Sequence, residues 1–140
     1  MLPTWINYFQ VKTIKPLSEP KKTYLLLAGF WTIFIAVLCL VSFNQLPKPA
    51  ISGIDKYVHI TLHFVFTILW ACYLKAKSTD RLFLKVLMAS IVYGILIEVA
   101  QETFTTTRHA DILDVLANTT GSVLAIAAMC LTSRLLKKKN

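Results

Sequence analysis

Charged residues are scarce in this sequence. Only 16% of its 140 residues are charged, and seven of them are acidic, whereas 56% are hydrophobic and the mean hydropathy is +0.60. A chain of this length that is so apolar does not match an ordinary soluble domain. The composition therefore predicts one small integral membrane domain.

Cysteines are few, and the common catalytic motifs are absent. Cys39, Cys72 and Cys130 are odd in number, lie inside apolar runs and form no CxxC or metal-ligand spacing, so we expect packed thiols and no structural disulfide. The sequence also has no Gly-x-Ser-x-Gly elbow, no phosphate-binding glycine loop and no nucleotide-binding motif. Nothing in it therefore points to an α/β-hydrolase or to a nucleotide-dependent enzyme.

The five prolines all fall outside four long apolar runs, at residues 24–43, 57–74, 82–97 and 112–136. Each run approaches the roughly 20 residues that a helix needs to span a bilayer. The third run is the shortest, and it spans only if Lys85 snorkels at one end and the turn with Glu98, Gln101 and Glu102 continues the helix at the other. The predicted fold class is all-α, an integral membrane bundle of four transmembrane helices.

The amino-terminal segment has two interpretations. Residues 3–13 have the apolar spacing of a short interfacial amphipathic helix, and a frayed tail is the alternative. We expect no signal-peptide cleavage, because the first apolar run is long and begins only after Lys21 and Lys22. The expected organisation is a cytoplasmic interfacial and basic segment (1–22), a four-helix transmembrane domain (23–136) and a basic cytoplasmic tail (137–140).

The net charge of +8 reflects topology more than nucleic-acid binding. Twelve of the fifteen lysines and arginines lie in the amino-terminal segment, near the loop at residues 75–85, or at the carboxyl-terminal end from Arg134 onward. Because positively charged segments stay in the cytoplasm, this distribution predicts a multi-pass plasma-membrane protein with both termini cytoplasmic. Membrane lipids are then the expected partners of the basic excess, and nucleic acid is not.

Polar residues gather at the expected outer end of three of the helices. At about 100° per residue, each helix carries its polar residues within one arc of roughly 100°. A carboxylate at the centre of a bilayer costs on the order of 2.5 to 3.5 kcal/mol, so such arcs need compensation. The three arcs contain Asp55, Lys56, His59 and His63; Gly94, Glu98, Gln101 and Glu102; and Asp111, Asp114, Asn118, Gly121 and Ser122.

The order and spacing of these residues closely resemble VanZ-like membrane proteins. The shared pattern is Asp-Lys-x-x-His, then Gly-x-x-x-Glu-x-x-Gln, then Arg-x-x-Asp-x-x-Asp-x-x-x-Asn-x-x-Gly, over residues 55–121. The resemblance implies a small multi-helix envelope protein, of a family named after a factor that lowers susceptibility to the lipoglycopeptide teicoplanin. The ligand-binding candidates are Asp55, Lys56, His59, Glu98, Gln101, Arg108, Asp111, Asp114 and Asn118.

Several roles remain open for these residues. They can form a buried hydrogen-bond network that fixes helix register. Alternatively, His59 and His63 can hold a divalent metal with Glu98 or Asp111, although His-x-x-x-His alone lacks the glutamate of a metalloprotease helix. Paired carboxylates, or His59 oriented by Asp55, can supply acid–base chemistry. The catalytic candidates are His59, Glu98, Asp111 and Asp114.

Lys56 and Arg108 are the cations nearest to these carboxylates. Their expected role is to neutralise Glu98 and Asp111, and binding a phosphate or a ligand carboxylate is the alternative.

Our leading interpretation is a protein that binds or modifies an amphiphilic cell-surface ligand, a lipid-linked cell-wall component or a lipoglycopeptide, at an outer-leaflet polar pocket. A proton- or ion-coupled transporter and a structural or partner-binding bundle are the alternatives. A relay is favoured less, because the fourth run offers nothing ionisable between Asn118 and Arg134 except Cys130.

Overall fold

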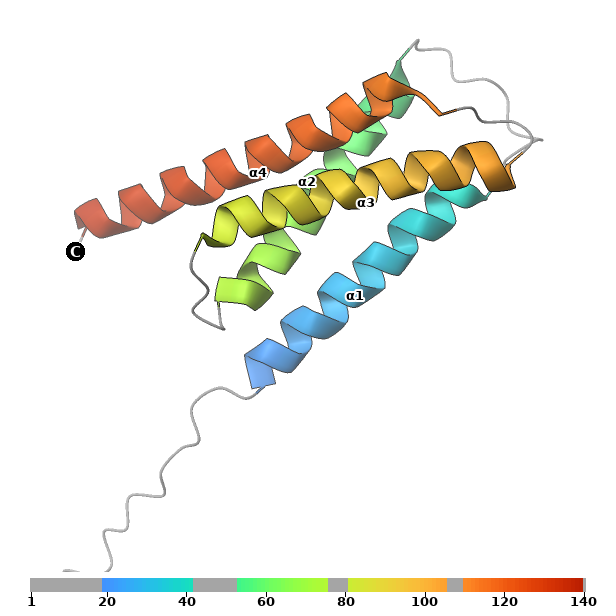
Figure 1. Ribbon diagram of the computed structural model, residues 1–140. Coiled ribbons are helices and arrows are strands. Elements are labelled where there is room, and N and C mark those ends of the chain that lie inside the picture. Colours follow the sequence, from blue (N-terminus) through green and yellow to red (C-terminus); the bar gives the residue numbers. More distant parts are fainter. Residues whose placement is uncertain (1–18, 42–52, 76–80, 106–109, 140) are drawn as a thin grey trace, which may run out of the picture.

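The computed structural model describes residues 19–41, 53–75, 81–105 and 110–139 (Figure 1). These residues form four helices and, within the described ranges, no strand. The helices are α1 (Glu19–Leu40), α2 (Ile54–Lys75), α3 (Leu82–Phe104) and α4 (Ile112–Lys139). Each contains a stretch long and apolar enough to cross a membrane. The predicted all-α membrane bundle is thereby confirmed.

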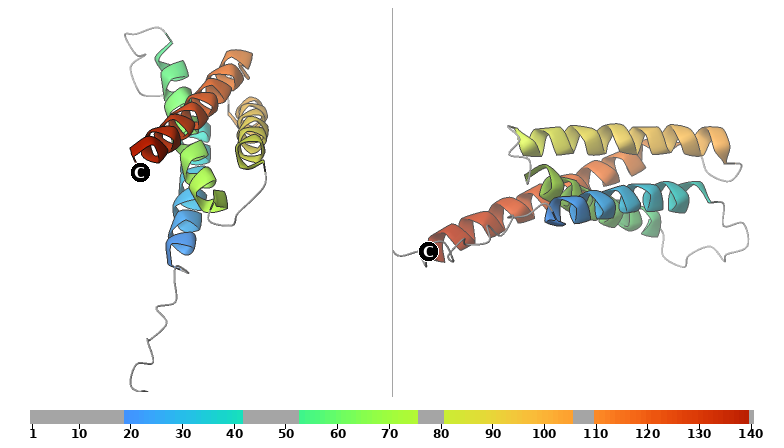
Figure 2. Two further views of the ribbon diagram at one scale, coloured as in Figure 1. Left: turned by 90° about the vertical axis from the view of Figure 1, so that its left-hand side faces the viewer. Right: turned by 90° about the horizontal axis from the view of Figure 1, so that it is seen from below.

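Successive helices run in opposite directions, so one end of the bundle gathers the carboxyl ends of α1 and α3 and the amino ends of α2 and α4 (right-hand side of Figure 1). We call this the polar end, because Asp55, Glu98 and Asp111 all lie there. At the other end, the carboxyl-terminal part of α4 projects beyond the remaining helices (Figure 2).

The helices extend beyond the predicted apolar runs. α1 begins at Glu19 and takes Pro20 into its first turn, where a missing backbone N–H costs nothing. α3 continues to Phe104, which confirms that the turn bearing Glu98 and Gln101 prolongs the short third run. α4 continues three residues past Leu136 to Lys139. Residues 3–13, for which an interfacial helix and a frayed tail are the two predictions, lie outside the described residues.

α1 packs against α2 and α3 through an apolar core made of Ile35, Cys39, Leu62, Phe66 and Ile97. Hydrogen bonds to both neighbouring helices help to fix its position. Trp31 Nε1 donates to the carbonyl of Leu62 at 3.0 Å, and the hydroxyl of Tyr93 donates to the carbonyl of Thr32 at 2.5 Å. Large apolar side chains such as that of Leu26, which is 72% exposed, cover the outside and suit contact with lipid.

α2 packs most extensively against α4. The two backbones approach so closely that a Cβ atom at Gly121 would collide with the main chain of Ile60. Small residues at such crossings are what allow membrane helices to pack tightly. The close crossing places the polar arc of α2 directly against that of α4.

Candidate functional site

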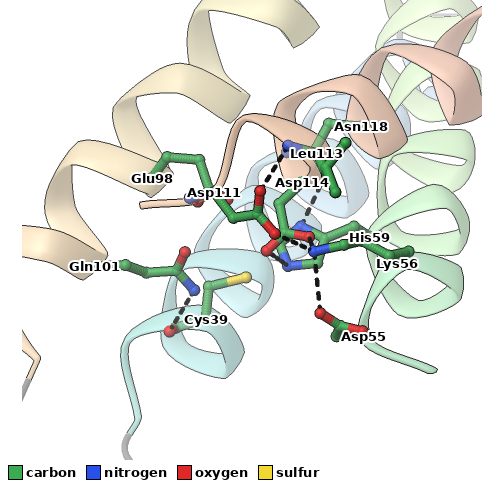
Figure 3. Close-up of polar contacts among 10 residues, drawn as sticks. All are labelled: Cys39, Asp55, Lys56, His59, Glu98, Gln101, Asp111, Leu113, Asp114 and Asn118. Carbon is green, nitrogen blue, oxygen red and sulfur yellow. Dashed lines mark hydrogen bonds and ion pairs between the residues drawn. The ribbon is translucent and has the colours of Figure 1, made fainter. Parts of the chain in front are cut away.

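Lys56, in the first turn of α2, lies among three carboxylates. Its ammonium group donates to Asp55 Oδ2 at 3.1 Å, to Asp111 Oδ2 at 2.5 Å and to Asp114 Oδ1 (Figure 3). The Lys56 side chain is only 26% exposed. Lys56 is therefore occupied in neutralising acids of its own chain, which include Asp111, as expected, and Asp55 and Asp114 rather than Glu98. It has little capacity left to bind a foreign anion.

His59, one turn further along α2, is 3% exposed and lies between two residues of α4. Its Nδ1–H donates to Asn118 Oδ1 at 3.0 Å, because an amide oxygen can only accept. Its Nε2 lies 3.7 Å from Asp114 Oδ2. In the described structure Asp55 bonds Lys56, whereas Asp114 is the carboxylate that faces the His59 ring.

Asp111 caps the amino end of α4. Its Oδ1 accepts from the backbone N–H of Leu113 at 2.8 Å, the usual bond of a helix-capping aspartate. Hydrogen bonding from Lys56 is the main reason why the pKa of the Asp111 carboxyl lies below its ordinary value. The backbone N–H of Asp111 in turn donates to Glu98 Oε2 at 3.1 Å, which ties the start of α4 to α3.

Glu98 is 3% exposed, and its second carboxylate oxygen, Oε1, is buried with no hydrogen-bond partner among the described residues. One potential ligand atom each from His59, Glu98 and Asp114 lie within 4.8 Å of one another. We call Asp55, Lys56, His59, Glu98, Asp111 and Asp114 together the charged cluster. Its members come from α2, α3 and the start of α4, so the fold brings together residues that lie far apart in the sequence.

A second polar group lies deeper along the same interface. Ser90 of α3 bonds His63 Nδ1 at 2.7 Å and Ser122 Oγ at 2.6 Å, and all three side chains are buried. We call His63, Ser90 and Ser122 the hydroxyl cluster. His63 thus faces Ser90 and takes no part in the group formed by His59, Glu98 and Asp114.

Ser90 and Thr67 are buried polar residues that the sequence reasoning missed. Both continue the arcs by one turn, since Ser90 precedes Gly94 by four residues and Thr67 follows His63 by four. Their periodicity could have revealed them. Thr67 is fully buried, and its hydroxyl has no partner in the described part of the chain.

Gln101 and Gly94 have structural roles. Gln101 Nε2 donates to the carbonyl of Cys39 at 3.0 Å, so this predicted ligand-binding residue fastens α3 to α1 (Figure 3). At Gly94, a Cβ atom would lie 2.9 Å from Asn118 Nδ2, so the glycine makes room for the amide of Asn118. The three cysteines form no disulfide.

A cavity of about 200 Å³ lies between the last turn of α1 and the first turns of α2. His59 is part of its wall and also contacts the charged cluster, so it joins the two. Asp55 is the second polar residue of the wall, and the other lining residues are Leu38, Cys39, Ile54, Val58 and Leu62.

Two predicted polar residues remain, Glu102 and Arg108. Arg108, the expected second cation, lies outside the described residues. Glu102 is exposed, and its Oε2 accepts from the backbone N–H of Ala110 at 2.8 Å.

Comparison with known proteins identifies a family. The family model described as VanZ/LLP1 matches residues 5–133, which is most of the chain. No curated protein and no solved structure matches.

Proposed function

The chain belongs to the VanZ/LLP1 family and has four membrane-spanning helices, and from this premise we propose that it binds an amphiphilic cell-surface ligand at the polar end. The ligand class is a lipid-linked cell-wall component or a lipoglycopeptide such as teicoplanin. Its apolar part enters the cavity between α1 and α2, and its polar part meets His59 and Asp55.

The observation that carries this proposal is the composition of the cavity wall. Five of its seven lining residues are apolar, and the two polar ones, Asp55 and His59, belong to the charged cluster. Binding sites for small molecules commonly combine an apolar wall with a few polar groups that fix orientation. An amphiphile matches this combination, whereas a small hydrophilic solute leaves most of the wall unsatisfied.

The state of Lys56 favours a ligand whose polar group is not simply an anion. Its ammonium group already contacts Asp55, Asp111 and Asp114, and removing a carboxylate from such a set leaves a poorly compensated charge. His59 borders the cavity and offers a ring that can donate or accept hydrogen bonds. We therefore assign the polar contact of the ligand to His59 and Asp55.

The proposal places the polar end at the outer leaflet of the plasma membrane and both termini in the cytoplasm, as the lysine and arginine distribution indicates. Single cysteines at Ala110 and Arg81 test this orientation, because both positions are exposed and lie at opposite ends of the bundle. With the native cysteines replaced by serine, an impermeant maleimide should label Ala110→Cys in whole cells. Labelling of Arg81→Cys instead would show that the topology is the inverse of the proposed one.

Binding is tested with the purified chain in lipid nanodiscs. The probes are teicoplanin, a lipid-linked disaccharide-peptide precursor, and a glycopeptide that lacks an acyl chain. We expect at least one of the first two to bind and the third to bind at least tenfold more weakly. Equal binding of the acyl-free glycopeptide, or no binding of either amphiphile, would refute the proposal.

A matched pair of variants locates the binding. Val58→Trp fills the cavity, whereas Leu116→Trp adds the same side chain to α4 outside the cavity lining; the two parent residues are 48% and 56% exposed. Val58→Trp should weaken amphiphile binding at least tenfold, and Leu116→Trp should leave it unchanged. Similar affinities for the two variants would mean that the ligand binds elsewhere.

A further inference from the structure

We infer that His59, Glu98 and Asp114 bind a divalent transition-metal cation of the Zn²⁺ type at the polar end. The inference goes beyond the proposed function, and because metal content and amphiphile binding are measured separately, either can fail without the other. It starts from the grouping of one nitrogen and two carboxylate oxygens within 4.8 Å, on three buried side chains from three different helices.

With a neutral imidazole, all three grouped atoms can act as acceptors. His59 Nδ1–H is committed to Asn118 Oδ1, so in the neutral ring Nε2 presents a lone pair. It faces Asp114 Oδ2 at 3.7 Å, which is too far for a hydrogen bond. Lone pairs that converge in a buried space repel one another unless a proton or a metal cation lies among them.

Glu98 supplies a second observation that points to a ligand at this place. Its Oε2 is bonded to the backbone N–H of Asp111, whereas Oε1 is buried and unpartnered within the described ranges. Leaving a polar oxygen buried without a partner costs free energy, and native proteins rarely do so without a functional reason. A metal ion bound to Oε1 removes that cost.

The surroundings already orient the proposed ligands. A metal-binding histidine usually donates its other ring N–H to an oxygen, and Asn118 Oδ1 accepts that bond from His59. Asp114 is held in the same way, because its Oδ1 bonds Lys56 while Oδ2 faces His59. These contacts fix the two side chains before any ion enters.

The geometry and the ligand types indicate the class of ion. Two ligands of one Zn²⁺ lie at most about 4 Å apart, twice the usual metal–ligand distance, so small side-chain rotations close the group around an ion. One imidazole with two carboxylates suits Zn²⁺ or a similar transition metal better than Ca²⁺ or Mg²⁺, which prefer all-oxygen sites. Three protein ligands also leave a coordination position open for water or for a substrate oxygen.

The test measures metal binding directly on the full chain in detergent. After treatment with a chelator, the protein is dialysed against Zn²⁺ and its metal content is measured by mass spectrometry; Co²⁺ serves as a visible-absorption probe. We expect about one Zn²⁺ per chain, a higher melting temperature with Zn²⁺, and a Co²⁺ band that Zn²⁺ abolishes. A parent protein that retains neither Zn²⁺ nor Co²⁺ overturns the inference without recourse to any variant.

Two matched glutamate variants on α3 place the ion. Glu98→Gln should weaken Zn²⁺ binding at least tenfold, whereas Glu102→Gln, one turn further on and exposed, should bind as the parent does. Asp114→Asn is the second test and applies even if Glu98→Gln fails to fold. Parent-like Zn²⁺ affinity in either the Glu98 or the Asp114 variant means that the ion lies elsewhere and overturns the assignment.

Discussion

The charged cluster and the hydroxyl cluster lie on the same interface of α2, α3 and α4 but satisfy their polar groups differently. In the hydroxyl cluster, Ser90 bonds both His63 and Ser122, and Ser122 also donates to the carbonyl of Asn118. In the charged cluster, Glu98 Oε1 is buried without a partner in the described structure. A cluster that only holds helices together gains nothing from an unpaired carboxylate oxygen.

Each cluster fits a different interpretation, and the two clusters lie at different depths along the interface. Neutral hydrogen bonds that fix helix register explain the hydroxyl cluster, whose members lie within the buried interface. An excess of ionisable groups next to a cavity is typical of a binding site and explains the charged cluster. Below the hydroxyl cluster and Thr67, the interface continues with Ala71, Val86 and Ala125, which offer no ionisable group for a relay.

The largest expected effect comes from separating α2 and α4, which disrupts both clusters together. Gly121→Val places new atoms against the backbone of Ile60, and overpacking of this kind costs about 1 to 3 kcal/mol or more. Gly29→Val is the control, because nothing lies within 4 Å of a Cβ atom at Gly29. In detergent, Gly121→Val should have a much lower melting temperature than Gly29→Val. Equal melting temperatures would mean that α2 and α4 cross less closely than described.

The second-largest effect is expected from removing the lysine of the charged cluster. Lys56→Met leaves Asp55, Asp111 and Asp114 without the cation they share. Because the Lys56 side chain is 26% exposed, we expect the free energy of unfolding to fall by less than in a buried pair. Removing one partner of a buried pair costs about 3 to 5 kcal/mol. Lys85→Met, at an exposed position of α3, is the control. A melting temperature unchanged in Lys56→Met would show that the carboxylates are neutralised by another group.

A smaller effect is expected from the hydroxyl cluster. Ser90→Ala deprives His63 and Ser122 of a shared partner, and a buried polar group left unsatisfied costs about 1 to 3 kcal/mol. Ser133→Ala, on an exposed face of α4, should cost little. Ser90→Ala should lower the melting temperature without changing amphiphile affinity, and a specific loss of affinity would move the site deeper into the bundle.

The smallest effect is a pH dependence that belongs to Asp111. Its pKa is lower in the folded protein than the ordinary value of about 3.9, because Lys56 bonds the ionised carboxylate. The unfolded chain therefore binds a proton first, so this contribution is complete above the ordinary pKa and is lost as the pH falls through the folded value. Asp111→Asn should remove that part of the acid dependence of unfolding. Identical acid profiles for variant and parent would contradict the Lys56–Asp111 bond.

The sequence predicted the helices and the faces, and it could not predict which atoms would meet. Apolar run length located all four helices, and the 3.6-residue period placed His59 and Asp114 on faces that do come together. The polar face of a helix does not determine which residues of the neighbouring helices it contacts, however. Gln101 shares an arc with Glu98, yet it bonds the main chain of α1, and His63 shares an arc with His59, yet it faces Ser90. Such differences depend on helix rotation and crossing.

The most direct test of the central claim, that the charged cluster is a site, uses isosteres that remove charge but keep shape. Glu98→Gln and Asp114→Asn should melt within about 1 to 2 kcal/mol of the parent, the common range for point mutations. They should nevertheless lose amphiphile binding in nanodiscs, because both carboxylates lie beside His59, through which the charged cluster meets the ligand. Parent-like binding by both variants, or a loss only in proportion to the folded fraction, would show that the charged cluster is structural.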